Sequence, residues 1–300
     1  MADSGKLIEL SDVSQVFRGA AFRQVGGELT AVDSASFQLT ADPPHITSLV
    51  GESGSGKSTI ARIILGLQRP TSGRVTYYGK DIYDLHGEDF QRYRRDVQAV
   101  FQDPYGIFNP FYRVDRVFWT AIKKFKLAKS QKGGDDLIAE ALEAVGLRPN
   151  DVLGRYPHQI SGGQRQRIML ARAYMCRPSF IIADEPVSML DAAVRVLFLN
   201  VLLDFKQNYG MTTLFITHDL STAYYVGGEA LVISKGKIVE RGAVDDVLVH
   251  PTHPYTQMLL SSLPAPDPDS RWRGKLDAAD VAELAAAEND SRSSEGVIAT

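Results

Sequence analysis

The chain has 300 residues, of which 44% are hydrophobic and 23% are charged. This composition excludes a wholly disordered chain and supplies enough apolar material for one large α/β domain or two smaller ones. Lysine and arginine together number 33, against 36 for aspartate and glutamate. The resulting net charge of −3 argues against general binding to nucleic acid.

The cysteine count and the hydropathy pattern bound where the protein works. Cys176 is the only cysteine, so the chain cannot form an intrachain disulfide or a cysteine-based zinc or iron–sulfur site. Its first residues lack the basic and then apolar run of a secretory signal. The richest apolar stretch, 194–205, is interrupted by polar residues and falls short of the ~20 residues that a bilayer requires. We expect a protein of the reducing cytosol that does not span a membrane by itself.

The N-terminal third predicts strands followed by a helix. Segments 7–17 and 31–39 alternate apolar and polar residues and predict an antiparallel sheet. The apolar run 45–50 predicts a strand that stops at a glycine-rich loop, and 57–67 places apolar residues at helical spacing. A further strand is predicted at 74–78.

The rest of the chain adds helices and then more strands. Between about 110 and 160 the pattern is helical, most clearly at 135–145, with Gly146 as the expected cap. Compact apolar runs are typical of strands that are covered on both faces of a parallel sheet. Three later segments are strand-like: 180–183, 212–217 and a hairpin at 230–243 that turns at 234–237.

The loop between the predicted strand and helix, residues 51–59, matches the P-loop pattern G-x-x-x-x-G-K-[ST]. Its glycines let successive N–H groups point inward, Lys57 can reach the β and γ phosphates of a nucleotide, and Ser58 can ligate Mg²⁺. The alternative is a glycine-rich turn that binds nothing. We expect a nucleoside triphosphate, with these contacts: Gly51, Ser53, Gly54, Ser55, Gly56, Lys57, Ser58 and Thr59.

Two acids end the apolar strand predicted at 180–183. Asp184 could hold a metal through water, and Glu185 would lie beside the γ phosphate as a general base or water-orienting residue. The alternative is an ordinary strand followed by a solvated acidic turn. The P-loop upstream favours the catalytic interpretation.

Ile160 precedes Ser161-Gly162-Gly163-Gln164, which opens a helical stretch and so could bind an anion. This segment resembles the Leu-Ser-Gly-Gly-Gln signature of ATP-binding-cassette (ABC) proteins. The resemblance runs from about residue 7 to residue 263. It implies an α/β fold with a P-loop NTPase core of mostly parallel sheet, an N-terminal antiparallel β-subdomain and an inserted α-helical signature subdomain. It also implies a head-to-tail dimer, in which each ATP lies between the P-loop of one subunit and the signature loop of the other.

Other motifs follow in the order of the ABC family. Gln102 resembles the Q-loop glutamine, which contributes to the metal and the attacking water. Asp191, in Ser188-Met189-Leu190-Asp191, resembles the D-loop and is expected to cross the dimer interface. His218 resembles the switch histidine that contacts the γ phosphate. Phe17 is the candidate for stacking on adenine, with Phe22 as the alternative.

The resemblance thus implies three sets of site residues. The catalytic set is Glu185, His218, Gln102 and Lys57. The Mg²⁺ set is Ser58, Gln102 and Asp184. The ATP contacts outside the P-loop are Phe17, Gln102, Asp184, Ser161, Gly162, Gly163, Gln164 and Asp191.

His253-Pro254-Tyr255-Thr256 closely resembles the oligopeptide/dipeptide type of importer ATPase. This implies a peripheral ATPase subunit on the cytoplasmic face of the inner membrane. Its partners would be a second ATPase subunit, identical or related, two separate transmembrane permease subunits and, indirectly, an extracytoplasmic solute-binding protein. Some relatives carry oligosaccharides or nickel instead. Residues 254–300 lack the cysteine cluster that members of this type often have.

The expected domain organisation follows from the same resemblance. Residues 1–263 form the nucleotide-binding domain, with a helical subdomain at about 105–178 and the His-Pro-Tyr segment at about 244–263. Residues 264–300 form an acidic tail. A soluble ABC ATPase is a less favoured alternative, because repair-type members need a long coiled-coil insertion. A GTPase is disfavoured because no Asn-Lys-x-Asp segment is present.

Overall fold

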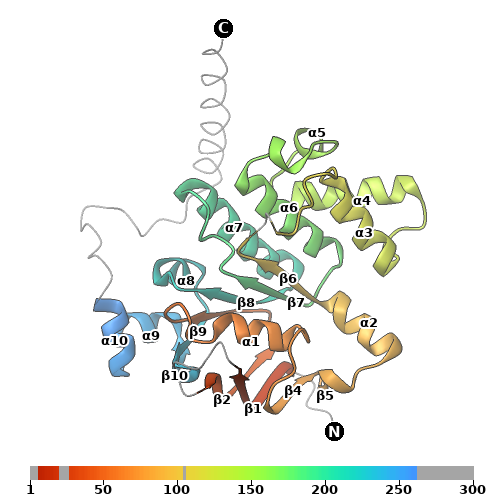
Figure 1. The fold of residues 1–300 in the computed structure, drawn as a ribbon. Coiled ribbons are helices and arrows are strands. Elements are labelled where there is room, and N and C mark those ends of the chain that lie inside the picture. The colour runs from red at the N-terminus through yellow and green to blue at the C-terminus, as the bar shows by residue number, and fades with distance from the viewer. Residues whose placement is uncertain (1–5, 20–26, 104–105, 262–300) are drawn as a thin grey trace, which may run out of the picture.

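The computed structural model describes residues 6–19, 27–103 and 106–261. This part of the chain contains two β-sheets, and helices pack around the six-stranded one (Figure 1). One sheet has four strands in the order β2-β1-β4-β5, and the other has six in the order β10-β9-β3-β8-β7-β6. Neighbours in the six-stranded sheet run parallel, except that β10 is antiparallel to β9. The predicted α/β fold, with a mostly parallel core and an antiparallel N-terminal sheet, is confirmed.

The element bounds follow the predicted order. The strands are β1 Lys6–Arg18, β2 Glu28–Thr40, β3 Ile46–Val50, β4 Ser72–Tyr77, β5 Lys80–Asp81, β6 Val97–Phe101, β7 Phe180–Asp184, β8 Thr212–Thr217, β9 Glu229–Ser234 and β10 Lys237–Ala243. The helices are α1 Lys57–Ile64, α2 Gly87–Asp96, α3 Asp115–Phe125, α4 Gln131–Ala144, α5 Pro149–Val152, α6 Gly162–Met175, α7 Ala192–Tyr209, α8 Leu220–Val226, α9 Val244–Val249 and α10 Pro254–Ser261, with short 3₁₀ turns at Ile82–Asp84 and Pro157–Gln159.

The antiparallel sheet packs against α1 and one face of the six-stranded sheet. Apolar side chains of β1 and β2, including Leu10 and Leu39, join Ile60 and Ile63 of α1 and Ile182 of β7 in one buried cluster. The alternation that predicted this sheet exists because one face of each strand is buried in that cluster while the other is solvated. The P-loop helix is thereby held by both sheets.

Helix α1 ends earlier than the sequence pattern predicted. We expected it to reach Leu67, but its last residue is Ile64. Gly66 has a φ of +66°, a left-handed conformation that suits glycine and terminates a helix. Leu67 is 62% exposed instead of buried. The periodicity of Leu67 does not show that the left-handed Gly66 ends the helix before it.

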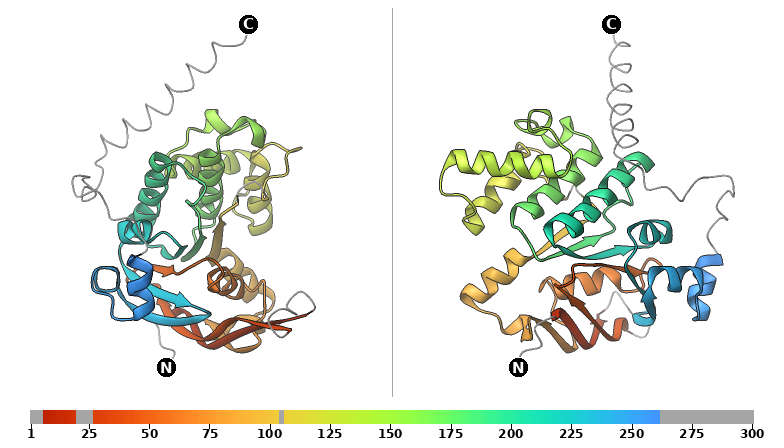
Figure 2. Two further views of the ribbon diagram at one scale, coloured as in Figure 1. Left: turned by 60° about the vertical axis from the view of Figure 1, so that its left-hand side comes forward. Right: turned by 180° about the vertical axis from the view of Figure 1, so that it is seen from behind.

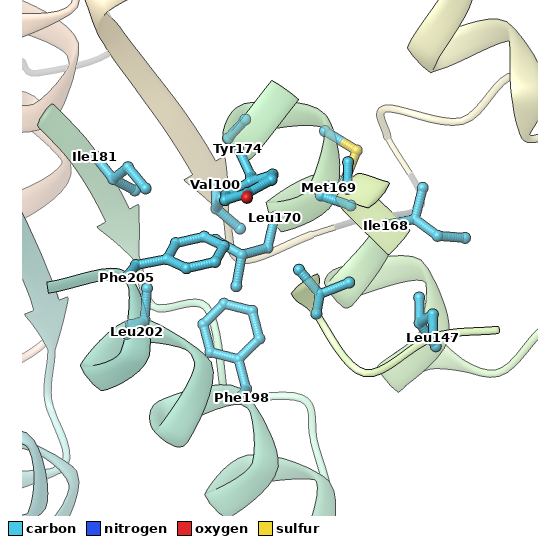
Figure 3. Packing of buried hydrophobic residues seen from close by; sticks show 14 of the residues in the cluster. Val100, Leu147, Ile168, Met169, Leu170, Tyr174, Ile181, Phe198, Leu202 and Phe205 are labelled. Carbon is cyan, nitrogen blue, oxygen red and sulfur yellow. The ribbon is translucent and has the colours of Figure 1, made fainter. Parts of the chain in front are cut away.

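A second core lies on the other face of the six-stranded sheet. Figure 3 shows Phe198 and Phe205 of α7 directed toward Leu170 and Tyr174 of α6, with Ile181 of β7 alongside. These side chains are almost fully buried. Each contributes on the order of 2 kcal/mol of transfer free energy. The cluster continues into α3 and α4, so the helical region shares its core with the sheet.

Helices α3 to α5 form a group at one end of the molecule (Figure 2). In both views of Figure 2 the helices α3 to α5 lie at the end of the molecule opposite the antiparallel sheet. Among the described residues, no helix is long and apolar enough to cross a membrane. Phe22 and the predicted tail at 264–300 fall outside the residues that the structure describes.

Candidate nucleotide-binding site

The P-loop connects the C-terminal end of β3 to the first turn of α1. Gly56 has a φ of +109°, and a Cβ there would lie 2.2 Å from the carbonyl oxygen of Ala31 in β2. At Gly51 a Cβ would lie 2.2 Å from the carbonyl oxygen of Ile233 in β9. Glycine is therefore required at both ends of the loop because neighbouring strands approach its backbone closely.

Lys57 lies within the curl of the loop. Its Nζ donates hydrogen bonds to the carbonyl oxygens of Gly51 and Glu52, both at 2.7 Å, and the residue is 4% exposed. Burial lowers the pKa of Lys57, and the nearby carboxylates of Glu185 and Asp184 offset this only in part. The geometry gives the loop a cation that is held in place, as recognition of phosphate requires.

Ser58 links the P-loop to β7. Its hydroxyl donates a hydrogen bond of 3.2 Å to Oδ1 of Asp184, which is 9% exposed. Burial raises the pKa of Asp184, and the Ser58 hydrogen bond and the Lys57 charge do not cancel that effect. Thr59 follows Ser58 and is half-buried. Two hard oxygen donors are thus side by side, and such donors suit Mg²⁺.

Glu185 and His218 meet at the ends of β7 and β8. Oε2 of Glu185 lies 3.2 Å from Nδ1 of His218. The Glu185 backbone has a φ of +48°, uncommon for a residue other than glycine, and its N–H donates to the Ile216 carbonyl at 2.9 Å. The Glu185 side chain is 16% exposed and that of His218 is 53% exposed. A strained backbone that holds a largely buried carboxylate against a histidine is the kind of feature found at active sites.

Gln102 and Phe17 are the predicted site residues contributed by the β6 and β1 regions. Gln102 is exposed directly after β6, whose Phe101 is in register with Asp184 of β7. Phe17 is half-buried and pairs with Leu29 of β2, two residues from the Ala31 that faces Gly56. Gln102 thus follows the strand next to β7, and Phe17 lies on β1, the partner of the strand whose Ala31 faces the P-loop.

The signature loop lies at the N-terminus of α6. The Ser161 hydroxyl accepts the Gln164 N–H at 3.1 Å, and Oε1 of Gln164 accepts the Ser161 N–H at 3.0 Å, which is a capping box. A Cβ on Gly163 would lie 2.5 Å from a methyl group of Val194 in α7. Within the described part of the chain, no hydrogen bond or ion pair joins this loop to the P-loop.

Asp191 caps the next helix, α7, since its Oδ1 accepts the Val194 N–H at 2.9 Å.

One contact that the sequence pattern did not predict reaches the P-loop from the C-terminal segment. The Glu52 N–H donates to the hydroxyl of Tyr255 at 3.2 Å. The motif around Tyr255 was visible in the sequence, but no local pattern indicates a contact across 203 positions.

Comparison with known proteins identifies the family of the chain. Residues 34–188 match the sequence model described as "ABC transporter", which is more than half of the chain. The chain belongs to the ABC transporter family. Residues 239–289 match a second model of this kind, "Oligopeptide/dipeptide transporter, C-terminal region".

Relatives of this ABC protein are similar over most of its length. It is 42% identical over 263 residues to the oligopeptide transport ATP-binding protein OppF of Streptococcus mutans, which covers 88% of this chain and 83% of the relative. It is 38% identical over 295 residues to the dipeptide transport ATP-binding protein DppF of Lactococcus lactis, which covers 97% and 92% respectively.

A solved structure adds the state of a related cassette. The dimeric post-hydrolysis form of the ATP-binding cassette MJ0796, bound to ADP and Pi, aligns with a TM-score of 0.69 and 26% identity, covering 79% of this chain and 99% of that one. The structure of cbiO1 from Clostridium perfringens aligns with a TM-score of 0.68 at 21% identity, which bears on the fold alone. This chain is therefore an ABC ATPase, and ATP is its nucleotide.

Proposed function

We propose that this chain hydrolyses ATP to power an importer of oligopeptides or dipeptides. The observation that carries the ATPase part is the pairing of Glu185 and His218 at the ends of β7 and β8, beside the strand whose Asp184 contacts the P-loop. The peptide part is supported by the C-terminal match at 239–289 and by the names of the relatives. Oligosaccharides or nickel are the alternative solutes.

The residues divide the chemistry among them. Lys57 and the P-loop N–H groups bind the phosphates and hold the γ phosphorus in position. Glu185 orients the attacking water and accepts its proton, while His218, 3.2 Å from that carboxylate, fixes the carboxylate and contacts the γ phosphate. Ser58, Asp184 and Gln102 would hold Mg²⁺, which when bound neutralises phosphate charge. Phe17 stacks on the adenine, which tunes affinity more than rate.

We further propose that the working unit is a head-to-tail dimer on the cytoplasmic face of the membrane. The solved relative is dimeric, and the loop Ser161–Gln164 has no bond to the P-loop of its own chain within the described residues. A partner's P-loop would then face this loop, with Asp191 at the interface. An isolated subunit has an incomplete site in that arrangement.

A groove of about 330 Å³, lined by α2, β6, α3, Arg172 of α6 and the segment after α1, is the proposed docking site for the permease subunits. Its lining combines apolar residues such as Leu67 and Phe101 with the basic residues Arg94, Lys124 and Arg172. Phe111, beyond β6, is 84% exposed. Gln102 directly follows Phe101, so a subunit in this groove would be coupled to the ATP site. A groove with an apolar floor and basic side chains, next to a catalytic loop, fits an amphipathic helix of a partner protein.

The proposal is tested by purifying the tagged Glu185→Gln chain with ATP from solubilised native membranes and identifying the retained proteins by mass spectrometry. Slow hydrolysis should preserve the closed dimer. We expect two permease subunits, with or without a second ATPase. The Lys57→Ala chain is the control, and it should lose the ATP-dependent part of the retention. Ribosomal or DNA-repair partners without any membrane protein would overturn the importer function.

A further inference from the structure

We propose that Tyr255 is a positioning residue of the ATP site, whose hydroxyl holds the P-loop in the shape that binds phosphate. The inference rests on the proposed function, because it assumes that the P-loop binds ATP. It gives the His-Pro-Tyr segment, residues 253–255, a task inside its own subunit.

The contact is made at the beginning of the loop. The Glu52 N–H donates to the Tyr255 hydroxyl at 3.2 Å. On the other side of the same residue, the Glu52 carbonyl accepts from Nζ of Lys57 at 2.7 Å and from the Ser55 N–H at 3.2 Å. Glu52 is therefore held between the phosphate-binding lysine and the C-terminal segment.

The other half of the loop is held by the sheets. The Ser55 carbonyl accepts the Gly236 N–H at 2.9 Å from the turn between β9 and β10. Gly56 lies so close to Ala31 of β2 that no Cβ fits between them. Tyr255 thus supports the first half of the loop from outside the two sheets.

Tyr255 is itself held by packing and by a hydrogen bond. Its ring packs against a buried cluster that includes Val50, the residue before the P-loop, and Val247 of α9. Its N–H donates to Nδ1 of His253 at 3.1 Å. This arrangement fixes the direction of the hydroxyl, because the backbone and the ring are both held.

Glu240 of β10 anchors the segment that leads to Tyr255. Its Oε1 accepts the N–H and the hydroxyl of Thr252, both at 2.7 Å, and its Oε2 accepts the His253 N–H at 3.2 Å. A carboxylate that accepts several hydrogen bonds is a strong anchor. A series of hydrogen bonds therefore connects Glu240 of the sheet to the His-Pro-Tyr segment, and that segment to the P-loop.

The effect on binding follows from preorganisation. P-loop N–H groups must converge before ATP arrives, and any freedom of the loop has to be removed on binding. Loss of one net hydrogen bond corresponds to roughly three- to tenfold weaker affinity. We expect ATP affinity to fall by this factor and KM to rise by the same factor. The hydrolysis rate at saturating ATP should be nearly unchanged, because Tyr255 is not expected to touch the reacting atoms.

The test compares Tyr255→Phe with Tyr225→Phe in the full chain. Tyr255→Phe removes the hydroxyl and keeps the ring in its cluster. Tyr225→Phe removes a hydroxyl that donates to Asn200 at 2.7 Å, between α8 and α7, and so controls for the loss of a hydrogen bond elsewhere. Affinity is measured by titrating a fluorescent ATP analogue, and melting temperature is recorded for each variant. Only Tyr255→Phe should weaken binding. Equal affinity in Tyr255→Phe and wild type would overturn the inference and leave the proposed function intact.

A double-mutant cycle separates positioning from general destabilisation. If Glu240 supports the loop through Tyr255, Glu240→Gln should also weaken ATP binding, and combining it with Tyr255→Phe should add little. Additive losses would show that the two residues act independently and would contradict the inference that Glu240 supports the P-loop through Tyr255. A wild-type chain that binds no nucleotide would overturn the proposed function, and this inference with it.

Discussion

At the scale of single residues, two glycines of the P-loop, Gly54 and Gly56, are needed for different reasons. Gly54 has a φ of +81° and open space around it, whereas Gly56 has a φ of +109° and the Ala31 carbonyl 2.2 Å from where a Cβ would be. A side chain at either position would therefore strain the backbone, but only a side chain at Gly56 would also collide with a neighbouring strand. The loop's shape depends on β2 as much as on its own sequence.

Gly56→Ala should therefore be far more damaging than Gly54→Ala. A left-handed conformation costs an alanine roughly 1–2 kcal/mol, and both variants bear a cost of this kind. The clash with Ala31 adds to it at Gly56 alone. We expect at least tenfold weaker ATP binding for Gly56→Ala and a smaller loss for Gly54→Ala, measured by the same titration. Equal losses would contradict the role of the Ala31 contact.

Cys176 provides a test of burial that does not involve the ATP site. It is 1% exposed, and burial raises the pKa of its thiol to about 11. Because the thiolate is the reactive form, only about one thiol in a thousand is ionised at pH 8. We expect alkylation by iodoacetamide at pH 8 to be slow in the native chain and fast in denaturant. Native alkylation at the rate of the unfolded chain would contradict this.

The raised pKa of Cys176 also determines how the free energy of unfolding changes with pH. The pKa of Cys176 is higher in the folded chain than its ordinary value of 9.0, so the folded state holds the proton more tightly. The stability that this provides is complete below about pH 9 and is lost as the pH rises toward about 11. Cys176→Ala should remove this part of the alkaline loss of stability, as followed by denaturant unfolding at several pH values.

At the scale of elements, the two helix N-termini near the site are capped by side chains to which the family resemblance also gives interface roles. Ser161 and Gln164 cap α6, and Asp191 caps α7. A cap orients the first turn of the helix and satisfies its free N–H groups. Loss of activity in a variant of a capping residue could therefore follow from a destabilised helix or from a lost interface contact. The choice of substitution has to separate these two causes.

Asp191→Ala and Asp191→Asn make that separation. Alanine removes the acceptor for the Val194 N–H and should destabilise the chain by about 1 kcal/mol. Asparagine keeps an acceptor oxygen without the charge, so its melting temperature should stay near that of wild type. Reduced ATP turnover in Asp191→Asn at unchanged stability would support the interface role. Equal destabilisation by both substitutions would contradict the capping argument.

The elements also show how far the sequence could go. The P-loop, β7 with its two acids, and the β9–β10 hairpin could be predicted because each is encoded within a few adjacent residues. The end of α1 was predicted three residues too late, because periodicity does not register the left-handed Gly66. Gly56 against Ala31 and Tyr255 against Glu52 could not be predicted, because they join separate elements. The roles of Gln102, Phe17 and the signature loop remain proposals.

At the scale of the whole molecule, the candidate site joins parts that are distant in sequence. The P-loop follows β3, the acids follow β7, and His218 follows β8, while β2 and α10 support the loop from outside. A ligand held by so many elements binds the folded chain and not the unfolded one. Binding should therefore stabilise the whole molecule by mass action.

ATP with Mg²⁺ should raise the melting temperature of the chain. At a ligand concentration 100 times Kd the stabilisation is about 2.7 kcal/mol, a shift of several degrees for a domain of this size. Lys57→Ala should abolish the shift, because the phosphates lose their fixed cation. Differential scanning fluorimetry of both chains provides the measurement. An equal shift in the two chains would mean that ATP binds elsewhere.

The order of the six-stranded sheet has a consequence for synthesis. The two neighbours of β3 are β8 and β9, which begin at Thr212 and Glu229. While the ribosome makes the first 200 or so residues, both edges of this apolar strand have no partner, and exposed strand edges promote aggregation. The nascent chain therefore carries its P-loop on an unpaired strand until the last third has emerged. A chaperone that shields β3 during translation would raise the yield of folded protein.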